Sequence, residues 1–137
     1  GVVIVPQSTD GRFLLLRVNR YATGGASLEF PRGGGHADED VVASGSRELL
    51  RETGLIGKDW SILGYQHPDN AIVMTKVAVL RAVIPENADK SLQLNTQEAI
   101  AEGMLVTYDD MTELVRNGHI TDGFTLGALT IYRAHIG

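Results

Sequence analysis

Short apolar runs separated by turn-forming residues predict that the chain begins with β-strands. A β-branched run opens the chain, and Thr9-Asp10-Gly11 after it is typical of a hairpin turn. Pro31 ends a later run because its ring removes a backbone donor. The predicted strands lie at residues 2–5, 13–18, 28–30, 60–65, 71–83 and 102–106. Residues 21–27 are predicted to form a loop, and residues 85–94 a polar connection that we expect to be mobile.

Three further stretches predict helices. The first covers residues 38–53, with acidic residues near its start, where they favour the helix dipole, and with Gly54 as its C-terminal cap. The residues expected toward its inner face are Val42, Ser46, Leu49 and Thr53. Two more helices are predicted at residues 108–116 and 121–135. This order predicts an α/β fold, a mixed β-sheet covered by helices on both sides, formed as one domain over residues 1–137.

The charge and composition of the chain narrow its partners. It carries 17 acidic and 12 basic residues, a net charge of -5, so we expect no nucleic-acid or membrane-surface partner, since either needs a basic surface. A phosphate-bearing small molecule fits only if metal ions or local arginines offset the repulsion. The chain has no cysteine, which excludes disulfides and thiolate chemistry and fits a cytoplasmic location. No apolar run approaches the ~20 residues that span a bilayer.

A glycine-rich loop leads directly into the first predicted helix, which carries spaced glutamates. Gly33-Gly34-Gly35 can offer backbone amides and a carbonyl to phosphate or metal. Glu48 and Glu52 lie one helical turn apart and repel each other by ~0.2–0.5 kcal/mol unless a cation lies between them. Mg²⁺ suits this position because it takes carboxylate, carbonyl and water oxygens together with substrate phosphates. The alternative is a solvated helix in which Arg47 and Arg51 form surface ion pairs with the glutamates.

The loop and the helix together resemble the Nudix box, an ordered set of nine specified positions with fixed spacers. Eight of the nine match, namely Gly33, Glu39, Arg47, Glu48, Leu49, Glu52, Gly54 and Leu55. The resemblance implies a Nudix-type α/β/α sandwich that hydrolyses a pyrophosphate bond in a nucleotide-derived substrate with Mg²⁺ or Mn²⁺. It also implies that Glu48 and Glu52 bind the metal and act in catalysis. We expect Leu49 and Leu55 to anchor the helix in the core.

Arg51 departs from the box, which has a glutamate at this position. The exchange places a positive charge inside the expected metal cluster, so the site is expected to be weaker or to use fewer metals. Two further interpretations exist for Arg51. It contacts the substrate phosphates in place of a cation, or it points to solvent and pairs only with Glu48. The sequence leaves these alternatives open.

The sequence outside the box is similar to the ADP-ribose pyrophosphatase branch of the family. The similar stretches lie at residues 15–21, 28–31, 114–122 and 125–129. This similarity implies that Arg20 contacts the substrate and that the backbone carbonyl of Arg32 binds metal, with the Arg32 side chain, Gly33 and Gly34 also at the substrate. The alternative for Arg20 is a plain surface residue. From ADP-ribose, the expected products are AMP and ribose 5-phosphate.

Members of that branch usually begin with a small β-domain that contributes to dimerisation and to adenine binding. This sequence begins at Gly1, without a methionine and directly with a predicted strand. Two alternatives follow: such a segment precedes Gly1 in the full protein, or this protein binds the nucleoside in a different way. The same resemblance implies a homodimer.

A further acidic residue usually comes from a loop after the box, as a metal ligand or as the base for the attacking water. Glu98 is the best-placed candidate for both roles and Glu102 is the second choice, the alternative for each being a solvated loop glutamate. The four histidines have no ligand spacing, although His36 lies within the glycine loop. Tyr21 could stack on a base only if its loop folds over the pocket.

Three functions are compatible with these residues. The first is hydrolysis of ADP-ribose or a similar nucleoside diphosphate derivative. The second keeps the chemistry but acts on a nucleoside triphosphate, a dinucleoside polyphosphate or another nucleotide sugar. The third is a non-catalytic nucleotide-sensing domain, which the arginine at position 51 favours.

Overall fold

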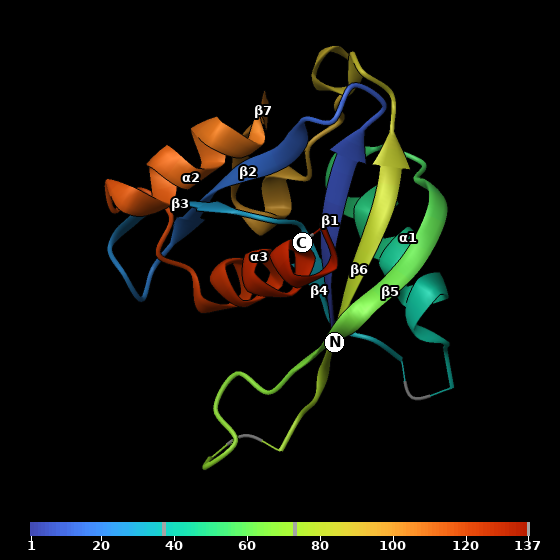
Figure 1. Ribbon diagram of the computed structural model, residues 1–137, viewed down its shortest axis with the longest axis vertical. Coiled ribbons are helices and arrows are strands. Elements are labelled where there is room, and N and C mark those ends of the chain that lie inside the picture. The colour runs from blue at the N-terminus through green and yellow to red at the C-terminus, as the bar shows by residue number, and fades with distance from the viewer. Residues whose placement is uncertain (37, 73, 137) are drawn as a thin grey trace.

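A mixed seven-stranded β-sheet forms the centre of the computed structural model, which describes residues 1–36, 38–72 and 74–136 (Figure 1). The strands are β1 (Val2–Ser8), β2 (Phe13–Arg20), β3 (Gly25–Glu29), β4 (Arg32–Gly33), β5 (Lys58–Gln66), β6 (Val77–Ile84) and β7 (Ile100–Val106). Five of them follow the order β3-β2-β1-β6-β5, while β4 pairs with β1 and β7 pairs with β2. β1 and β6 run parallel. The other pairs are antiparallel: β1 with β2 and with β4, β2 with β3 and with β7, and β5 with β6.

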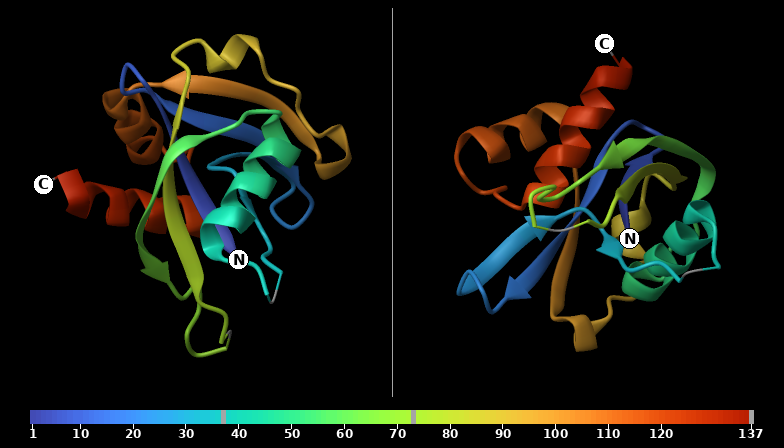
Figure 2. Two further views of the ribbon diagram at one scale, coloured as in Figure 1. Left: turned by 90° about the vertical axis from the view of Figure 1, so that its right-hand side faces the viewer. Right: turned by 90° about the horizontal axis from the view of Figure 1, so that it is seen from below.

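Helices cover both faces of this sheet. The helices are α1 (Val41–Thr53), α2 (Tyr108–Arg116) and α3 (Gly123–Ile136), and the short 3₁₀ turns η1 (Ala88–Lys90) and η2 (Thr96–Glu98) connect β6 to β7. α1 and α3 lie on opposite sides of the β1–β6 pair (Figures 1 and 2). This arrangement confirms the predicted α/β fold, a mixed sheet with helices on both sides. Among the described residues, no helix is long and apolar enough to cross a membrane.

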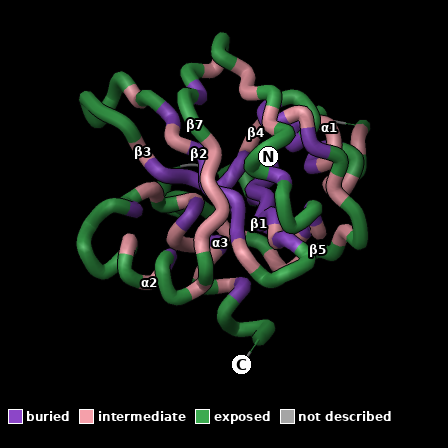
Figure 3. Tube along the Cα trace, turned by 90° about the horizontal axis from the view of Figure 1, so that it is seen from above, coloured by how far each residue is buried: buried purple, intermediate pink, exposed green. Residues whose placement is uncertain are grey.

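The central strand β1 is buried on both faces, as its β-branched sequence requires (Figure 3). Side chains alternate along a strand, so Val3 and Val5 face one core and Ile4 faces the other. Val3 and Val5 pack in a cluster that contains Tyr132 of α3. Ile4 packs in a cluster that reaches Val41 of α1. The strand is therefore held from both sides and gives the neighbouring loops a fixed base.

Helix α1 starts later than predicted because Asp40 caps it. The Asp40 carboxylate accepts a hydrogen bond from the Ala43 N–H at 2.9 Å, so residues 38–40 precede the helix. At the other end, Gly54 has a φ of 77° and donates to the Leu50 carbonyl, which confirms the predicted cap. Leu49 is fully buried and Leu55 nearly so, which confirms both as anchors.

The buried face of α1 is only partly the predicted one, since Leu49 and Thr53 are fully buried as expected. Val42 and Ser46 are only partly buried. The buried residues are Ser44, Gly45, Glu48, Leu49, Glu52 and Thr53. Gly45 explains the difference, since a Cβ at this position would lie 3.0 Å from the Trp60 ring, and its absence lets that ring pack against the helix. Both glutamates are buried, which contradicts the alternative of a solvated helix with surface ion pairs.

Three predicted segments differ from the structure. Residues 25–27, assigned to a loop, belong to β3 because they pair with the end of β2. The strand predicted at 71–83 begins only at Val77, because hydrogen bonds from Ala71 and Ile72 to Asp69 stabilise a turn there; residue 73 lies outside the described residues. The connection at 85–94, expected to be mobile, is anchored at two points. Ala88 is fully buried, and the Gln93 N–H donates to the Thr53 carbonyl at 2.8 Å.

Candidate active site

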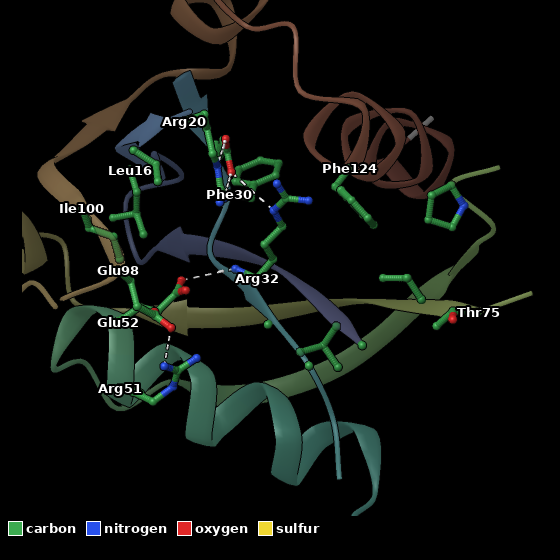
Figure 4. A pocket seen from close by; sticks show the side chains of 18 residues that line it. Leu16, Arg20, Phe30, Arg32, Arg51, Glu52, Thr75, Glu98, Ile100 and Phe124 are labelled. Atoms are coloured by element: carbon green, nitrogen blue, oxygen red, sulfur yellow. Dashed lines mark hydrogen bonds and ion pairs between the residues drawn. The ribbon is translucent and has the colours of Figure 1, made fainter. Parts of the chain in front are cut away.

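A cleft of about 680 Å³ lies beside the start of β1, the short strand β4 and the C-terminal half of α1 (Figure 4). This volume is in the range of small-molecule sites. Its polar walls contain most of the predicted site residues, which are Arg20, Arg32, Gly33, Gly34, Glu52 and Glu98. The cleft is also lined by Glu29 and Phe124, for which no site role was predicted, and by Arg51, the residue that departs from the expected glutamate. Glu48 is not among the lining residues.

Glu52 and Glu98 approach each other on one wall of the cleft (Figure 4). Glu52 is 8% exposed, and its Oε1 accepts a hydrogen bond from the Arg32 N–H at 3.3 Å. Burial, together with the neighbouring Glu98 carboxylate, raises the pKa of Glu52 to about 8. The Oε2 atom of Glu98 is buried and has no hydrogen-bond partner among the described residues. The two carboxylates therefore repel each other when both are ionised, and a proton or a cation between them would relieve this repulsion.

The loop that carries Glu98 is fastened to the end of α1. The Asn95 N–H donates to the Glu52 carbonyl at 3.1 Å, which brings the loop next to the helix. The Asn95 side chain then caps η2 by accepting from the Gln97 N–H at 3.1 Å. Glu98 ends this turn and thereby reaches Glu52 from 46 positions farther along the chain, which only the folded loop permits.

Glu48 lies behind Gly33 and is held by two arginines. It is 2% exposed, and a Cβ on Gly33 would overlap its carboxyl group. Arg47 Nη1 donates to Oε1 at 2.7 Å, and Arg51 Nη2 donates to Oε2 at 2.5 Å. Both carboxylate oxygens of this predicted metal ligand are thus already engaged.

Arg51 pairs with Glu48, as one of its interpretations predicts, but it does not simply point to solvent. Its Nη1 also donates to Oε1 of Glu98 on the opposite loop. The guanidinium therefore bridges two predicted metal ligands. Among the residues that the structure describes, no group of three or more acidic or histidine side chains is arranged to hold a metal ion.

The glycine loop is tied to α1 through Glu39 and Arg47. Arg47 donates to both carboxylate oxygens of Glu39, from Nη2 at 2.9 Å and from Nε at 3.2 Å, and to the Gly34 carbonyl at 3.1 Å. Ser44 Oγ donates to Oε1 of Glu39 at 2.7 Å. The hydrogen bonds from Arg47 and then Ser44 lower the pKa of Glu39 to about 2. These two box residues position the loop and Glu48, and neither lines the cleft.

The opposite wall carries a buried acid between two arginines. Glu29 is 2% exposed, and it accepts from Arg20 Nε at 3.0 Å and Nη2 at 2.6 Å and pairs with Arg32 at 3.3 Å. Burial by itself raises the pKa of Glu29, but the hydrogen bonds from Arg20 and Ser27 and the charges of both arginines outweigh it and lower the pKa. Glu29 was missed as a site residue, although a charged residue inside the apolar run Leu28-Glu29-Phe30 was a signal.

Helix α3 orients Arg32 on this wall. The Arg32 guanidinium lies 4.3 Å from the centre of the Phe124 ring and pairs with Asp122 at 3.4 Å. Asp122 in turn accepts hydrogen bonds from the N–H and the hydroxyl of Thr125. The same Thr125 hydroxyl accepts from the Phe30 N–H at 3.1 Å. The start of α3 thus fixes both the side chain of Arg32 and the backbone two residues before it.

A second cavity of about 510 Å³ adjoins the cleft across these arginines. Its lining comes from β3 and the loops before it and before α3, with Arg20, Glu29 and Arg32 shared between the two cavities. A ligand with two bulky ends could therefore place one end on each side of the same charged side chains.

The remaining candidates lie elsewhere. Glu102 pairs with Arg17 at 3.3 Å on exposed positions of β7 and β2, and it does not line the cleft. His36 is exposed in the glycine loop, and Tyr21 is fully exposed in the turn after β2. These positions favour Glu98 over Glu102 as the acid from the later loop.

The donor set of the cleft fits a hard divalent cation. Glu52 and Glu98 offer carboxylate oxygens, which are the atoms that Mg²⁺ and Mn²⁺ prefer. The unpartnered Oε2 of Glu98 is an acceptor for which a cation would compensate. The Arg32 backbone lies beside Glu52, as the hydrogen bond from its N–H shows.

Comparison with known proteins agrees with this fold. A family model described as the NUDIX domain matches residues 1–123. A crystal structure described as an ADP compounds hydrolase superposes with a TM-score of 0.82, covering 98% of this chain and 71% of that chain at 23% sequence identity. At this identity the likeness shows the fold, an α/β/α sandwich with a mixed sheet. A comparison with curated proteins gives no match.

Proposed function

The chain belongs to the Nudix hydrolase family, and we propose that this pyrophosphohydrolase cleaves the pyrophosphate bond of a nucleoside diphosphate derivative. The preferred reaction is hydrolysis of ADP-ribose to AMP and ribose 5-phosphate, with Mg²⁺ or Mn²⁺ as cofactor. One observation carries the proposal. The acids Glu52 and Glu98 face each other in a cleft whose opposite wall presents Arg20 and Arg32 (Figure 4).

The acidic wall would hold the cofactor. Glu52, Glu98 and the backbone carbonyl of Arg32 would be its donors, whereas Arg47 and Arg51 hold both carboxylate oxygens of Glu48. When bound, a divalent ion neutralises charge on the phosphates and makes a coordinated water more acidic. The Oε2 atom of Glu98, which has no partner among the described residues, is the oxygen left for the ion, because Arg51 already binds Oε1.

The arginine wall would hold the substrate. Arg32 is oriented by Phe124 and Asp122, and a guanidinium fixed in this way can place a phosphate in register with the acids. The backbone amides of Gly33 and Gly34 are further candidate phosphate donors on the floor of the cleft. Arg20 keeps two hydrogen bonds to Glu29, so its contact with substrate is expected through the remaining guanidinium nitrogen.

The two adjoining cavities support a substrate with two bulky ends. A pyrophosphate bound at the shared arginines would leave the nucleoside on one side and the sugar on the other. A nucleoside triphosphate has only one such end and would leave one cavity unfilled. The superposed structure, that of an ADP compounds hydrolase, supports the same substrate class.

A substrate panel tests this proposal. ADP-ribose, other nucleotide sugars, dinucleoside polyphosphates and nucleoside triphosphates are incubated with Mg²⁺ or Mn²⁺, and the products are separated by chromatography. AMP and ribose 5-phosphate from ADP-ribose support the proposal, whereas free pyrophosphate from triphosphates as the main product contradicts it. Glu52→Gln is expected to lower kcat/KM by about a hundredfold or more while the circular dichroism spectrum stays unchanged.

A second candidate function is nucleotide sensing without turnover. The observation that favours it is the engagement of Glu48 and Glu98 by Arg51, since both acids are family metal ligands. Nucleotide binding measured calorimetrically, with no product at high Mg²⁺ or Mn²⁺, would support sensing. Metal-dependent turnover that disappears in Glu52→Gln would exclude it.

A further inference from the structure

The guanidinium of Arg51 occupies the space between two acids that the family uses for metal. Arg51 lies in the last turn of α1 and donates to Oε2 of Glu48 at 2.5 Å and to Oε1 of Glu98. Arg47 takes the other oxygen of Glu48 at 2.7 Å. Three of the four oxygens of these two carboxylates therefore have arginine partners. The fourth, Oε2 of Glu98, is buried and lacks a partner among the described residues.

We infer that Arg51 is a built-in cation that limits this site to a single divalent ion, held between Glu52 and Glu98. The inference rests on the proposed function, because it assumes that the cleft binds a divalent metal. A second ion at Glu48 would have to displace Arg51 from that carboxylate and would be repelled by its charge at this short distance. Arg51 is thus a positioning residue that keeps Glu48 turned away from the metal.

The charges of the site agree with one ion. Glu48, Glu52 and Glu98 contribute three negative charges when ionised, and Arg51 cancels one of them. Arg47 is engaged in addition by Glu39, which offsets its charge. The remaining double negative charge matches one Mg²⁺ or Mn²⁺, whereas a glutamate at position 51 would leave enough negative charge for two.

The loop that carries Glu98 does not depend on Arg51 for its place. Its backbone is fastened to α1 by hydrogen bonds from Gln93 to Thr53 and from Asn95 to Glu52. The side chain of Arg51 is itself 42% exposed. Substitutions at position 51 are therefore expected to change the metal site while the fold stays intact.

The test is the number of Mn²⁺ ions that the full chain binds without substrate, measured by isothermal titration calorimetry and by electron paramagnetic resonance. We expect one ion in the wild type and two in R51E. The matched control is R17E, which reverses a charge in an exposed ion pair with Glu102 outside the cleft and is expected to bind one ion. In thermal unfolding, Mn²⁺ is expected to raise the Tm of R51E more than that of R17E or the wild type.

Two results would overturn the inference: two or more ions of similar affinity in the wild type, or the same stoichiometry in R51E as in R17E. If R51E does not fold, R51Q answers the question, because it also removes the bridging charge and is expected to admit a second, weaker ion. The substrate panel is independent of this measurement. Turnover of ADP-ribose by the wild type, together with the same ion stoichiometry in R51E as in R17E, would refute the inference alone. A second ion in R51E, together with no turnover of ADP-ribose by the wild type, would refute the proposed function alone.

Discussion

Arg20 forms two hydrogen bonds with Glu29, from Nε to Oε2 at 3.0 Å and from Nη2 to Oε1 at 2.6 Å. Glu29 is buried at the end of β3, and Arg32 approaches the same carboxylate from β4. Two arginines with a common buried partner keep their spacing without help from a ligand. This ion-pair group therefore fixes the side of the cleft to which we assign the substrate, and a separate set of contacts fixes the acidic side.

Replacing Glu29 tests whether this wall is structural. Glu29→Gln removes the only carboxylate that Arg20 and Arg32 share among the described residues and leaves Arg32 with Asp122 alone, so we expect the free energy of unfolding to fall by about 1–3 kcal/mol. Urea unfolding followed by circular dichroism measures the change. The control is Glu102→Gln, whose ion pair with Arg17 is exposed and is expected to contribute less than about 0.5 kcal/mol. Equal losses in the two variants would contradict the structural role of Glu29.

The close approach of Gly33 to Glu48 gives a second prediction. Gly33→Ala introduces a Cβ that overlaps the Glu48 carboxyl group, whose oxygens are held by Arg47 and Arg51 and cannot move freely. We expect a loss of about 1–3 kcal/mol in the free energy of unfolding, as for other overpacked positions. Gly34→Ala is the matched control, because its Cβ would meet no atom within 4 Å, and it should stay within about 0.5 kcal/mol of the wild type.

The two candidate acids from the later part of the chain can be separated by activity. Glu98→Gln removes the charge of the carboxylate oxygen that we assign to the metal ion, so kcat/KM for ADP-ribose is expected to fall by about a hundredfold or more. Glu102→Gln, on the exposed side of β7, is expected to keep wild-type kinetics. Loss of activity in Glu102→Gln with full activity in Glu98→Gln would reverse the assignment.

The pairing of Glu39 predicts a dependence of stability on pH. The hydrogen bonds from Arg47 and Ser44 lower the pKa of Glu39 in the folded protein to about 2, below its usual value of 4.5. Its contribution to stability is therefore fully present above pH 4.5 and is lost as the pH falls from 4.5 toward 2. Urea unfolding at neutral pH and at several acidic values should show a smaller decline for Glu39→Gln than for the wild type. An identical decline in both proteins would refute this role of Glu39.

Much of this protein could be predicted from local features of its sequence. Strand and helix periodicity predicted the α/β class, and the spacing of Gly33, Glu39, Arg47, Glu48 and Glu52 predicted the family, which the comparisons confirm. Such patterns are readable because neighbouring turns of one helix and one loop are joined by short stretches of chain. The departure of position 51 from the box is likewise visible in the sequence, because the spacing of the surrounding residues fixes its place in the pattern.

Only the tertiary structure decided which charged side chains form ion pairs with each other. Arg51 reaches Glu98 across 47 positions, and Glu29 collects Arg20 and Arg32 only because β2, β3 and β4 are brought together in one sheet. Glu48 and Glu52 are buried with Gly33 and the Arg32 backbone against them, and helical periodicity alone does not bring these segments together. Ion pairs between distant segments depend on burial and on side-chain direction in the folded chain, and neither is encoded in local spacing. The sequence by itself therefore determined the family and offered the candidate acids, and the fold determined that Arg51 pairs with two of them.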